Sequence, residues 1–263
     1  MEQKVVFVTG GSSGIGLSVC KALHARGCRV YEISRREVQH TDIIHIGADV
    51  ANEESVRAAA SYVTEKEGKI DILINNAGYG ISGAVEFTDG KDAKRLFDVD
   101  FFGMDSVTRA VLPVMRQNGG GRIVNISSVA AALPIPFQTY YSAVKAAVSA
   151  YSLALADEVR PFGIEVLAIM PGDIRTGFTA ARIKSHKGDD IYGGRMERSV
   201  SKMERDEERG MSCDAAGERI ARIALAKNPG PICTLGASYR FDVALAKILP
   251  MRLVRWIVRR MYG

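Results

Sequence analysis

The sequence contains few of the residues from which metal centres and disulfide frameworks are built. It has four cysteines with no CxxC pair among them, and four histidines without the spacing of metal ligands. The cysteines are Cys20, Cys28, Cys213 and Cys233, and the histidines are His24, His40, His45 and His186. We therefore expect reduced thiols and no metal site, and we interpret the histidines as structural or surface residues.

Long hydrophobic runs are also missing. No apolar stretch approaches the roughly 18 residues that a membrane-spanning helix needs. A strand-like run begins directly after the first few residues, which leaves no room for a signal peptide. With the scattered, unpaired cysteines, these two absences predict a cytoplasmic protein.

Excess charge of one sign is absent outside the C-terminal tail. The chain has a formal net charge of +5. Residues 240–263 contain six basic side chains and one acidic side chain, so the part before them is formally neutral. A protein that binds nucleic acid through a general basic surface is therefore not expected.

Apolar runs of strand length alternate with helix-like segments along the chain. The strand-like runs are 4–9, 29–33, 43–46, 71–75, 121–126 and 164–169, and the helix-like segments are 15–26, 53–67, 91–116 and 139–160. Such alternation is typical of a parallel sheet covered by helices on both faces. No linker or repeat divides the chain. The pattern predicts an α/β fold in which residues 1–263 form a single doubly wound domain.

A glycine-rich turn follows the first strand and opens the first helix. Its sequence is Thr9-Gly10-Gly11-Ser12-Ser13-Gly14-Ile15-Gly16. Gly10 permits a tight turn, while Gly14 and Gly16 let the backbone approach a pyrophosphate and let the helix pack on the sheet. Amides at the helix N-terminus favour an anion. A glycine cluster can also form a turn without a ligand, but in this context it predicts dinucleotide binding.

Tyr141 and Lys145 stand one helical turn apart in the segment Tyr141-Ser142-Ala143-Val144-Lys145. A phenol has a pKa of about 10, and an ammonium group on the same helix face would lower it toward neutrality. Ser128 lies thirteen positions before Tyr141, at the end of a strand-like run, and its hydroxyl could face the phenol. An ordinary amphipathic helix can carry the same Tyr-x-x-x-Lys spacing. With Ser128, the pattern favours acid–base catalysis.

Five motifs, in their order and spacing, resemble the successive signatures of the short-chain dehydrogenase/reductase family. They are the glycine loop, Asn75-Asn76-Ala77-Gly78, Ser128, Tyr141 to Lys145, and Pro171-Gly172-Asp173-Ile174-Arg175-Thr176. Together they extend over residues 4–176. The resemblance implies a Rossmann fold and a nicotinamide cofactor.

The resemblance also implies a role for each matching residue. Ser128 would orient and polarise the substrate oxygen, Tyr141 would be the acid and base, and Lys145 would lower the pKa of the tyrosine and bind the nicotinamide ribose. The expected cofactor contacts, besides Tyr141 and Lys145, are Gly10, Ser12, Ser13, Gly14, Ile15 and Gly16 in the loop, Asp49 and Val50 at the adenine, Asn76, Ala77 and Gly78, and Pro171, Gly172, Ile174 and Thr176 near the carboxamide and diphosphate.

The choice between NAD and NADP depends on the end of the second strand. An acidic residue there would bind the ribose 2′-hydroxyl and repel a 2′-phosphate. This chain has Ser34 at that position, followed by Arg35 and Arg36. Two arginines could merely solvate a strand end, but a guanidinium also matches phosphate geometry. The pattern favours NADP(H) over NAD(H).

One position departs from the family pattern. Asp100, in the run Asp98-Val99-Asp100-Phe101-Phe102-Gly103, stands where the family has an asparagine. In the family, the main-chain carbonyl of that asparagine holds a water of the proton relay from the lysine. The main-chain role survives in aspartate, so we retain Asp100 among the catalytic residues. Its added carboxylate is expected to raise the pKa of the lysine or to need a partner of its own.

Two further segments are candidates for the substrate site. Residues 177–211 are rich in both charges, and they form either a lid over the substrate, as in the family, or a solvated helical insertion. The apolar run 130–137 follows Ser128 and is expected to line a pocket for a bulky apolar substrate. The glycine loop, Arg35 after the second strand, the long lid segment and the extended C-terminus together resemble steroid and retinoid dehydrogenases of the family.

Residues 240–263 form a basic C-terminal extension in which a helix is expected to begin at Pro250. Its cationic stripe comprises Arg252, Arg255 and Arg259, and its apolar stripe comprises Leu253, Trp256, Ile257 and Met261, flanked by Val254 and Val258. Such a helix could dock on its own domain, pack on another subunit, close the pocket, or lie at an anionic membrane surface. A peripheral membrane contact through residues 250–263 is therefore one of four open alternatives.

Together these patterns predict an oxidoreductase that transfers hydride between NADP(H) and a carbonyl or secondary alcohol of a small apolar substrate. We expect it to be a homo-oligomer, a dimer or a tetramer. Two other classes stay open. One is an NADP(H)-binding regulator or scaffold without turnover, and the other is an adaptor that binds membranes through its tail.

Overall fold

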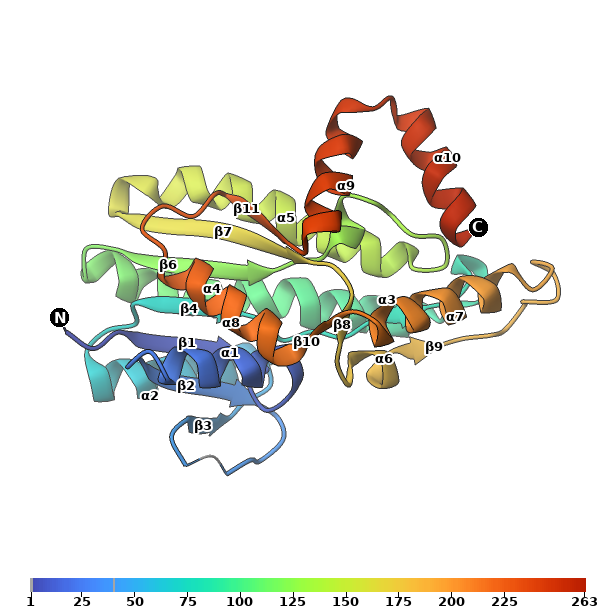
Figure 1. The fold of residues 1–263 in the computed structure, drawn as a ribbon. Helices are drawn as coiled ribbons and strands as arrows, with labels where there is room; N and C mark the ends of the chain where they lie inside the picture. Colours follow the sequence, from blue (N-terminus) through green and yellow to red (C-terminus); the bar gives the residue numbers. More distant parts are fainter. Residues whose placement is uncertain (1, 40) are drawn as a thin grey trace.

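The computed structural model describes residues 2–39 and 41–263, so His40 lies outside the described residues. Its centre is a seven-stranded parallel sheet in the order β11-β7-β6-β4-β1-β2-β3 (Figure 1). The strands are β1 (Val5–Thr9), β2 (Arg29–Ser34), β3 (Ile44–Gly47), β4 (Ile72–Asn75), β6 (Gly121–Ile126), β7 (Ile164–Pro171) and β11 (Ile232–Leu235). The predicted α/β class with a doubly wound parallel sheet is confirmed.

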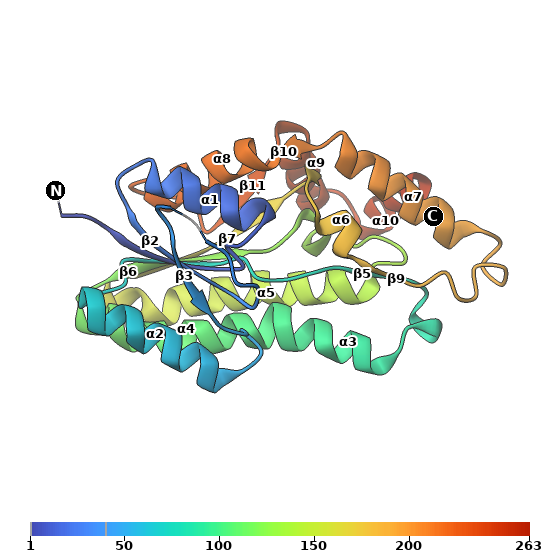
Figure 2. The same ribbon diagram turned by 90° about the horizontal axis from the view of Figure 1, so that it is seen from below.

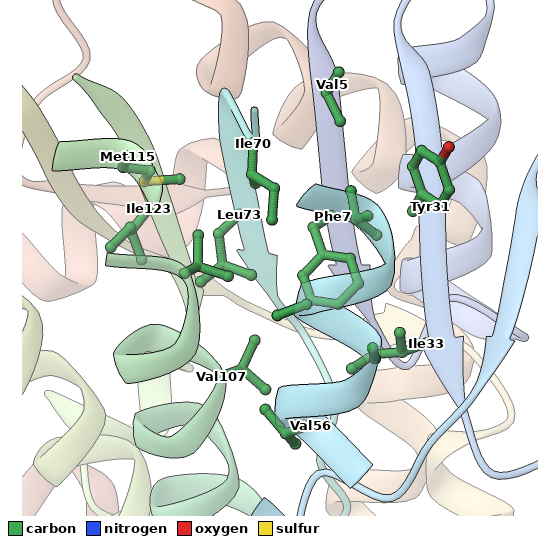
Figure 3. Close-up of a cluster of buried hydrophobic side chains, with 14 of the residues drawn as sticks. Val5, Phe7, Tyr31, Ile33, Val56, Ile70, Leu73, Val107, Met115 and Ile123 are labelled. Atoms are coloured by element: carbon green, nitrogen blue, oxygen red, sulfur yellow. The ribbon is translucent and has the colours of Figure 1, made fainter. Parts of the chain in front are cut away.

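Helices cover both faces of this sheet, as Figure 2 shows. Helices α1 (Gly14–His24) and α8 (Cys213–Leu225) lie on one face, and α2 (Glu53–Glu67), α4 (Met104–Gln117) and α5 (Thr139–Val159) lie on the other. Because side chains of a strand alternate between faces, each strand contributes to both layers. Val5 and Phe7 pack toward α2 and α4 in the core drawn in Figure 3, whereas Val6 and Val8 pack toward α1 and α8.

The helix expected over residues 91–116 is divided by a π-helical segment. Helix α3 (Gly90–Phe97) leads into six π-helical residues, Asp98–Gly103, and then into α4. Gly103 lies against the side chain of Val50, where an added Cβ would stand 2.9 Å from Cγ2. A π-helical turn is common at functional sites because it changes the direction in which a side chain points. Here Asp100 is buried.

Two large elements were missed by the sequence patterns. Helix α8 packs beside α1, and β11 forms the edge of the sheet next to β7. Most residues of β11 are only partly buried, so its apolar pattern is weak. Gly217 of α8 lies against the backbone of Ser18, where an added Cβ would stand 2.5 Å from its carbonyl carbon. This close helix contact is decided by tertiary packing.

Shorter elements lie beyond the carboxyl ends of the sheet strands, the side toward which the arrows point in Figure 1. They are β5 (Ile81–Ser82), β8 (Ile174–Arg175), α6 (Phe178–Ala181), β9 (Ile183–Lys184), α7 (Arg195–Glu208) and β10 (Met211–Ser212), with the 3-10 turns η1 (Val85–Phe87) and η3 (Val129–Ala131). The 3-10 turn η4 (Arg160–Phe162) lies at the other end of the sheet, directly before β7. Strand β5 pairs with β9, and β8 pairs with β10. These pairings hold the segment 177–211 at the end of the sheet.

The chain ends in a helical hairpin, α9 (Ala237–Ile248) and α10 (Met251–Tyr262), with Pro250 capping α10 as expected. In α10 the packed residues are Val254 and Val258, while Trp256 of the expected apolar stripe is 51% exposed. The Tyr262 hydroxyl donates to Asp206 Oδ2 of α7 at 3.3 Å. The helix therefore docks on its own chain through the face that was expected only to flank the apolar stripe.

No helix in the described part of the chain is both long enough and apolar enough to span a bilayer.

Candidate active site

A cavity of about 1070 Å³ opens at the carboxyl ends of the central strands. Nearly every residue that the sequence predicted for the site lines it. From that set these are Gly10, Ser12, Ser13, Gly14, Ile15, Arg35, Arg36, Asp49, Val50, Asn76, Ala77, Gly78, Ser128, Tyr141, Lys145, Pro171, Gly172, Ile174 and Thr176. Gly16 and Asp100 are buried beside the cavity and do not line it.

The glycine loop presents the N-terminus of α1 to this cavity. Ser13 is the N-cap, and its side chain makes no capping hydrogen bond, so the first amides of the helix have no side-chain acceptor. Gly14 has a φ of 55°, and a Cβ added there would meet no atom within 4 Å. Gly16 instead allows close packing, because its Cβ would stand 2.2 Å from the carbonyl oxygen of Gly10. An open cradle of amides at a helix N-terminus fits a diphosphate.

Hydrogen bonds join the glycine loop to the end of β4. The Thr9 hydroxyl accepts from the main-chain amides of Asn76 and Ala77, both at 2.9 Å. The Asn76 side chain donates to the carbonyl oxygens of Thr9 and Gly10 at 3.1 and 3.2 Å. These contacts fix two of the predicted motifs relative to each other.

Arg35 and Arg36 follow the last residue of β2 and are exposed at the rim of the cavity. Neither makes an ion pair with any residue that the structure describes, so both guanidinium groups are free for an anionic ligand. Asp49 follows the neighbouring strand β3, and its Oδ2 lies 3.4 Å from Nη2 of Arg95. The main-chain amide of Ala51 donates to Asp49 Oδ1 at 3.0 Å.

Ser128, Tyr141 and Lys145 meet at the inner part of the cavity. Ser128 is the residue before η3, and its hydroxyl accepts from the Ala130 amide at 3.2 Å. Tyr141 and Lys145 both belong to α5, and the Lys145 Nζ lies 5.8 Å from the centroid of the Tyr141 ring. Lys145 Nζ also donates to the carbonyl oxygen of Ile126 at 3.2 Å. The structure thus brings together the three side chains expected to carry the chemistry.

Asp100 forms a buried ion pair with Lys145, with 3.0 Å between Oδ2 and Nζ. The Tyr79 amide donates to its other oxygen at 3.0 Å. Gly78 makes room for the carboxylate, because a Cβ there would stand 2.6 Å from Oδ2. Burial raises the pKa of Asp100, and Lys145 acts against this rise. The carboxylate therefore has the partner that the sequence reasoning required.

The same pair changes the electrostatics of the tyrosine. Burial alone would lower the pKa of Lys145, but the Asp100 and Tyr141 charges raise it above its ordinary value. For Tyr141, burial raises the pKa and Lys145 lowers it, Asp100 raises it again, and a hydrogen bond from Ser128 lowers it. The net pKa of Tyr141 is raised. Lys145 acts in the expected direction, but burial and Asp100 outweigh it in the protein alone.

The motif that ends β7 is held by α9. The Tyr239 ring lies against Gly172, where an added Cβ would stand 2.1 Å from the ring, and the Tyr239 hydroxyl hydrogen bonds to Asp173. The hydroxyl of Thr176 accepts from the Phe178 amide at 2.9 Å. This segment leads the chain directly from the cofactor side of the cavity into 177–211.

The sequence patterns indicated a candidate lid over 177–211 and a helix over 250–263 that could close the pocket, but they did not single out the residues that line the opposite part of the cavity. They are Phe178, Ala181, Arg182 and Ile183 of the segment 177–211, Met203 and Glu207 of α7, and Tyr262 of α10. Phe178 contacts the site directly, with its ring centroid 5.8 Å from that of Tyr141. The mixed charges of this segment gave no periodic signal, and Tyr262 reaches the cavity only because α10 folds back.

Comparisons with known proteins agree with this geometry. The chain matches the family described as short chain dehydrogenase over residues 4–187. It is similar to a 3-ketodihydrosphingosine reductase of Bacteroides thetaiotaomicron, with 36% identity over 267 residues that cover 100% of this chain and 99% of that protein.

Two solved structures extend the comparison. A short-chain dehydrogenase from Streptomyces avermitilis has a TM-score of 0.84 and 32% identity, and the match covers 99% of this chain and 96% of that one. A 3-ketoacyl-(acyl-carrier-protein) reductase from Brucella melitensis, complexed with NADH, has a TM-score of 0.75 and 27% identity, with 89% and 97% covered. Because the family match covers most of this chain, the chain belongs to the short chain dehydrogenases, which are oxidoreductases that bind a nicotinamide cofactor.

Proposed function

We propose that this protein is an NADP(H)-dependent carbonyl reductase and alcohol dehydrogenase that acts on an apolar ketone or secondary alcohol. The proposal rests on one observation: Ser128, Tyr141 and Lys145 line the same cavity as the glycine loop. A cavity of this kind can hold the dinucleotide at one end and the substrate beside the tyrosine.

The side chains have distinct tasks in this reaction. When bound, the reduced nicotinamide supplies the hydride that reduces the carbonyl carbon. Ser128 donates a hydrogen bond to the substrate oxygen, and Tyr141 gives its phenolic proton to that oxygen as negative charge develops. Lys145 lowers the pKa of Tyr141, against the effects of burial and Asp100. In the oxidising direction, the same residues remove the proton of the alcohol.

The preference for NADP(H) rests on Arg35 and Arg36. Both lie at the rim of the cavity after β2, which ends at Ser34 and not at an acidic residue that would repel a 2′-phosphate. The similar reductase from Brucella melitensis is described with NADH, so both cofactors belong in the test.

The nature of the substrate rests on the walls near Tyr141. Ala130 and Ile135 of the predicted apolar run line the cavity, as do Val129, Phe178 and Met203. We propose that the segment 177–211 acts as a lid, because it supplies the wall opposite the cofactor side. The similar reductase named for 3-ketodihydrosphingosine makes a long-chain ketone of that type the first substrate to try.

A panel of ketones and secondary alcohols, followed by the absorbance of the reduced cofactor, tests the proposal. Turnover of at least one long-chain ketone with NADPH is the expected result. Tight NADPH binding without turnover across the panel would instead favour the regulator or scaffold, for which the replacement of asparagine by Asp100 is the supporting feature.

We further propose that the hairpin of α9 and α10 contacts anionic membrane surfaces. Ile248 is 82% exposed, Met251 65% and Trp256 51%, next to the exposed Arg252 and Arg255. Exposed apolar and cationic groups on one helix are typical of interfacial binding. The same patch could be the interface of the expected homo-oligomer, and the vesicle experiment in the Discussion separates the two.

A further inference from the structure

Arg182 is a buried cation at the substrate end of the cavity. The residue is 5% exposed, lies directly after α6, and lines the cavity. Its Nη2 forms an ion pair with Oε1 of Glu207 in α7. Its Nε and Nη1 have no hydrogen-bond partner among the residues that the structure describes.

Unpaired donors on a buried guanidinium are costly. The group has five N–H donors, and leaving buried donors without acceptors loses the hydrogen bonds that they made in water. Glu207 engages only Nη2 of the guanidinium, through its Oε1, and its Oε2 accepts instead from the Thr179 hydroxyl. If Arg182 served only to link α6 to α7, the N–H donors of Nε and Nη1 would have no hydrogen-bond acceptor.

The position of Arg182 relative to Tyr141 indicates that a bound substrate could accept hydrogen bonds from these N–H donors. Both residues lie close to the ring of Phe178, whose centroid is 5.8 Å from that of Tyr141 and 5.6 Å from Cζ of Arg182. A substrate whose carbonyl meets Tyr141 and whose chain passes Phe178 brings its neighbouring atoms to Arg182.

The local charge limits the kind of group that can bind. Glu207 offsets the charge of Arg182, so an anionic substrate group would face the Glu207 carboxylate, and a cationic one would face the guanidinium. A neutral oxygen, which accepts from the free N–H donors, avoids both penalties.

We propose that Arg182 is a specificity-determining residue that donates hydrogen bonds to a second, neutral oxygen near the reacting carbonyl, such as a β-hydroxyl or a neutral acyl oxygen. The inference rests on the proposed reductase function, and it adds that the substrate is a dioxygenated ketone with an apolar chain.

Two ketones of equal chain length, one with a β-hydroxyl and one without, test the proposal. Wild-type enzyme is expected to favour the β-hydroxy ketone in kcat/KM. Arg182→Met, which keeps an apolar stem, is expected to lower kcat/KM for that ketone by roughly 10- to 100-fold, as for a lost hydrogen bond to a charged group. For the plain ketone the change should stay within about threefold.

Lys184→Met is the matched control. Lys184 pairs with Glu204 in the same segment but does not line the cavity, so its loss should leave the substrate preference unchanged. The double variant Arg182→Met with Glu207→Gln removes both charges of the pair. If it recovers the preference for the β-hydroxy ketone, or if Arg182→Met slows both ketones equally, Arg182 is only a clamp and the proposal is wrong.

A binding experiment decides the proposal if neither ketone is turned over, an outcome that would overturn the reductase function itself. Calorimetry would then compare a 1,3-diol with the corresponding mono-alcohol, each added to the enzyme with NADP. Tighter binding of the diol to wild type, lost in Arg182→Met, supports the proposal, and equal affinities overturn it.

Discussion

The Nζ of Lys145 lies 3.0 Å from Oδ2 of Asp100, in a pair that is almost entirely removed from solvent. The lysine that should lower the pKa of Tyr141 therefore has its charge opposed by a neighbouring carboxylate. Because Asp100 raises the pKa of Tyr141 while Lys145 lowers it, we expect the pair to set the pH at which the tyrosine exchanges its proton.

Asp100→Asn is expected to shift the pH–rate profile to lower pH. The amide keeps the size of the side chain but removes the charge that raises the pKa of Tyr141. Alcohol oxidation needs the phenolate, so as the pH rises it should set in at a lower pH than in the wild type. Ketone reduction needs the phenol, so as the pH rises its rate should begin to fall at a lower pH than in the wild type. The rate at the optimum should be similar or higher.

Asp98→Asn is the control for this shift. Asp98 belongs to the same π-helical segment but pairs with Lys94 near the surface, so the same change in net charge should leave the profile in place. A shift of the Asp100→Asn profile to higher pH would mean that Lys145 had lost its proton together with its partner.

Tyr141→Phe is expected to abolish turnover and to leave cofactor binding nearly unchanged. Only the hydroxyl that transfers the proton is removed, while the ring can still pack beside Phe178. Initial rates and the fluorescence of bound NADPH measure the two properties separately. Tyr140→Phe, at a neighbouring position that does not line the cavity, should keep the wild-type rate. A wild-type rate in Tyr141→Phe would exclude the proposed proton transfer.

Arg35→Ala is expected to weaken NADPH binding by roughly 10- to 100-fold, the loss typical of a hydrogen bond to a charged group. NADH, which lacks the 2′-phosphate, should bind almost as before. Arg29→Ala, at the opposite end of β2, is the control and should affect neither cofactor. Equal losses for NADPH and NADH would show that Arg35 does not contact the phosphate.

Reversing the charges of Arg252, Arg255 and Arg259 to glutamate is expected to release the protein from anionic vesicles. These arginines are exposed and do not line the cavity, so turnover of a short soluble ketone should not change. Co-sedimentation at low salt measures the fraction of protein bound to anionic vesicles, and neutral vesicles serve as the control.

If the unaltered protein stays in the supernatant with anionic vesicles, the membrane contact is excluded. Analytical sedimentation would then show whether the protein forms a stable oligomer. If it does, and the Trp256→Ala variant is monomeric, the patch is a contact between copies of the chain. Deleting residues 250–263 would be a poorer test, because Tyr262 of that segment lines the cavity.

The sequence by itself determined the central sheet and most of the candidate site. Alternating apolar runs specified six of the seven strands, since a strand buried on both faces is apolar throughout. Tyr141 and Lys145 could be paired because helical spacing is local and does not depend on the rest of the fold. The glycine loop could be placed because a strand and a helix flank it directly.

Only the tertiary structure decided the contacts between distant segments. The partner of Asp100 depends on a π-helical segment and on the approach of α5, and Arg182 meets Glu207 only when α7 lies beside α6. In α10 the periodicity showed an apolar stripe flanked by Val254 and Val258, but not that these two valines would pack while Trp256 of the stripe stays exposed. Periodicity reports the faces that a helix can bury, and the shape of the rest of the molecule selects one.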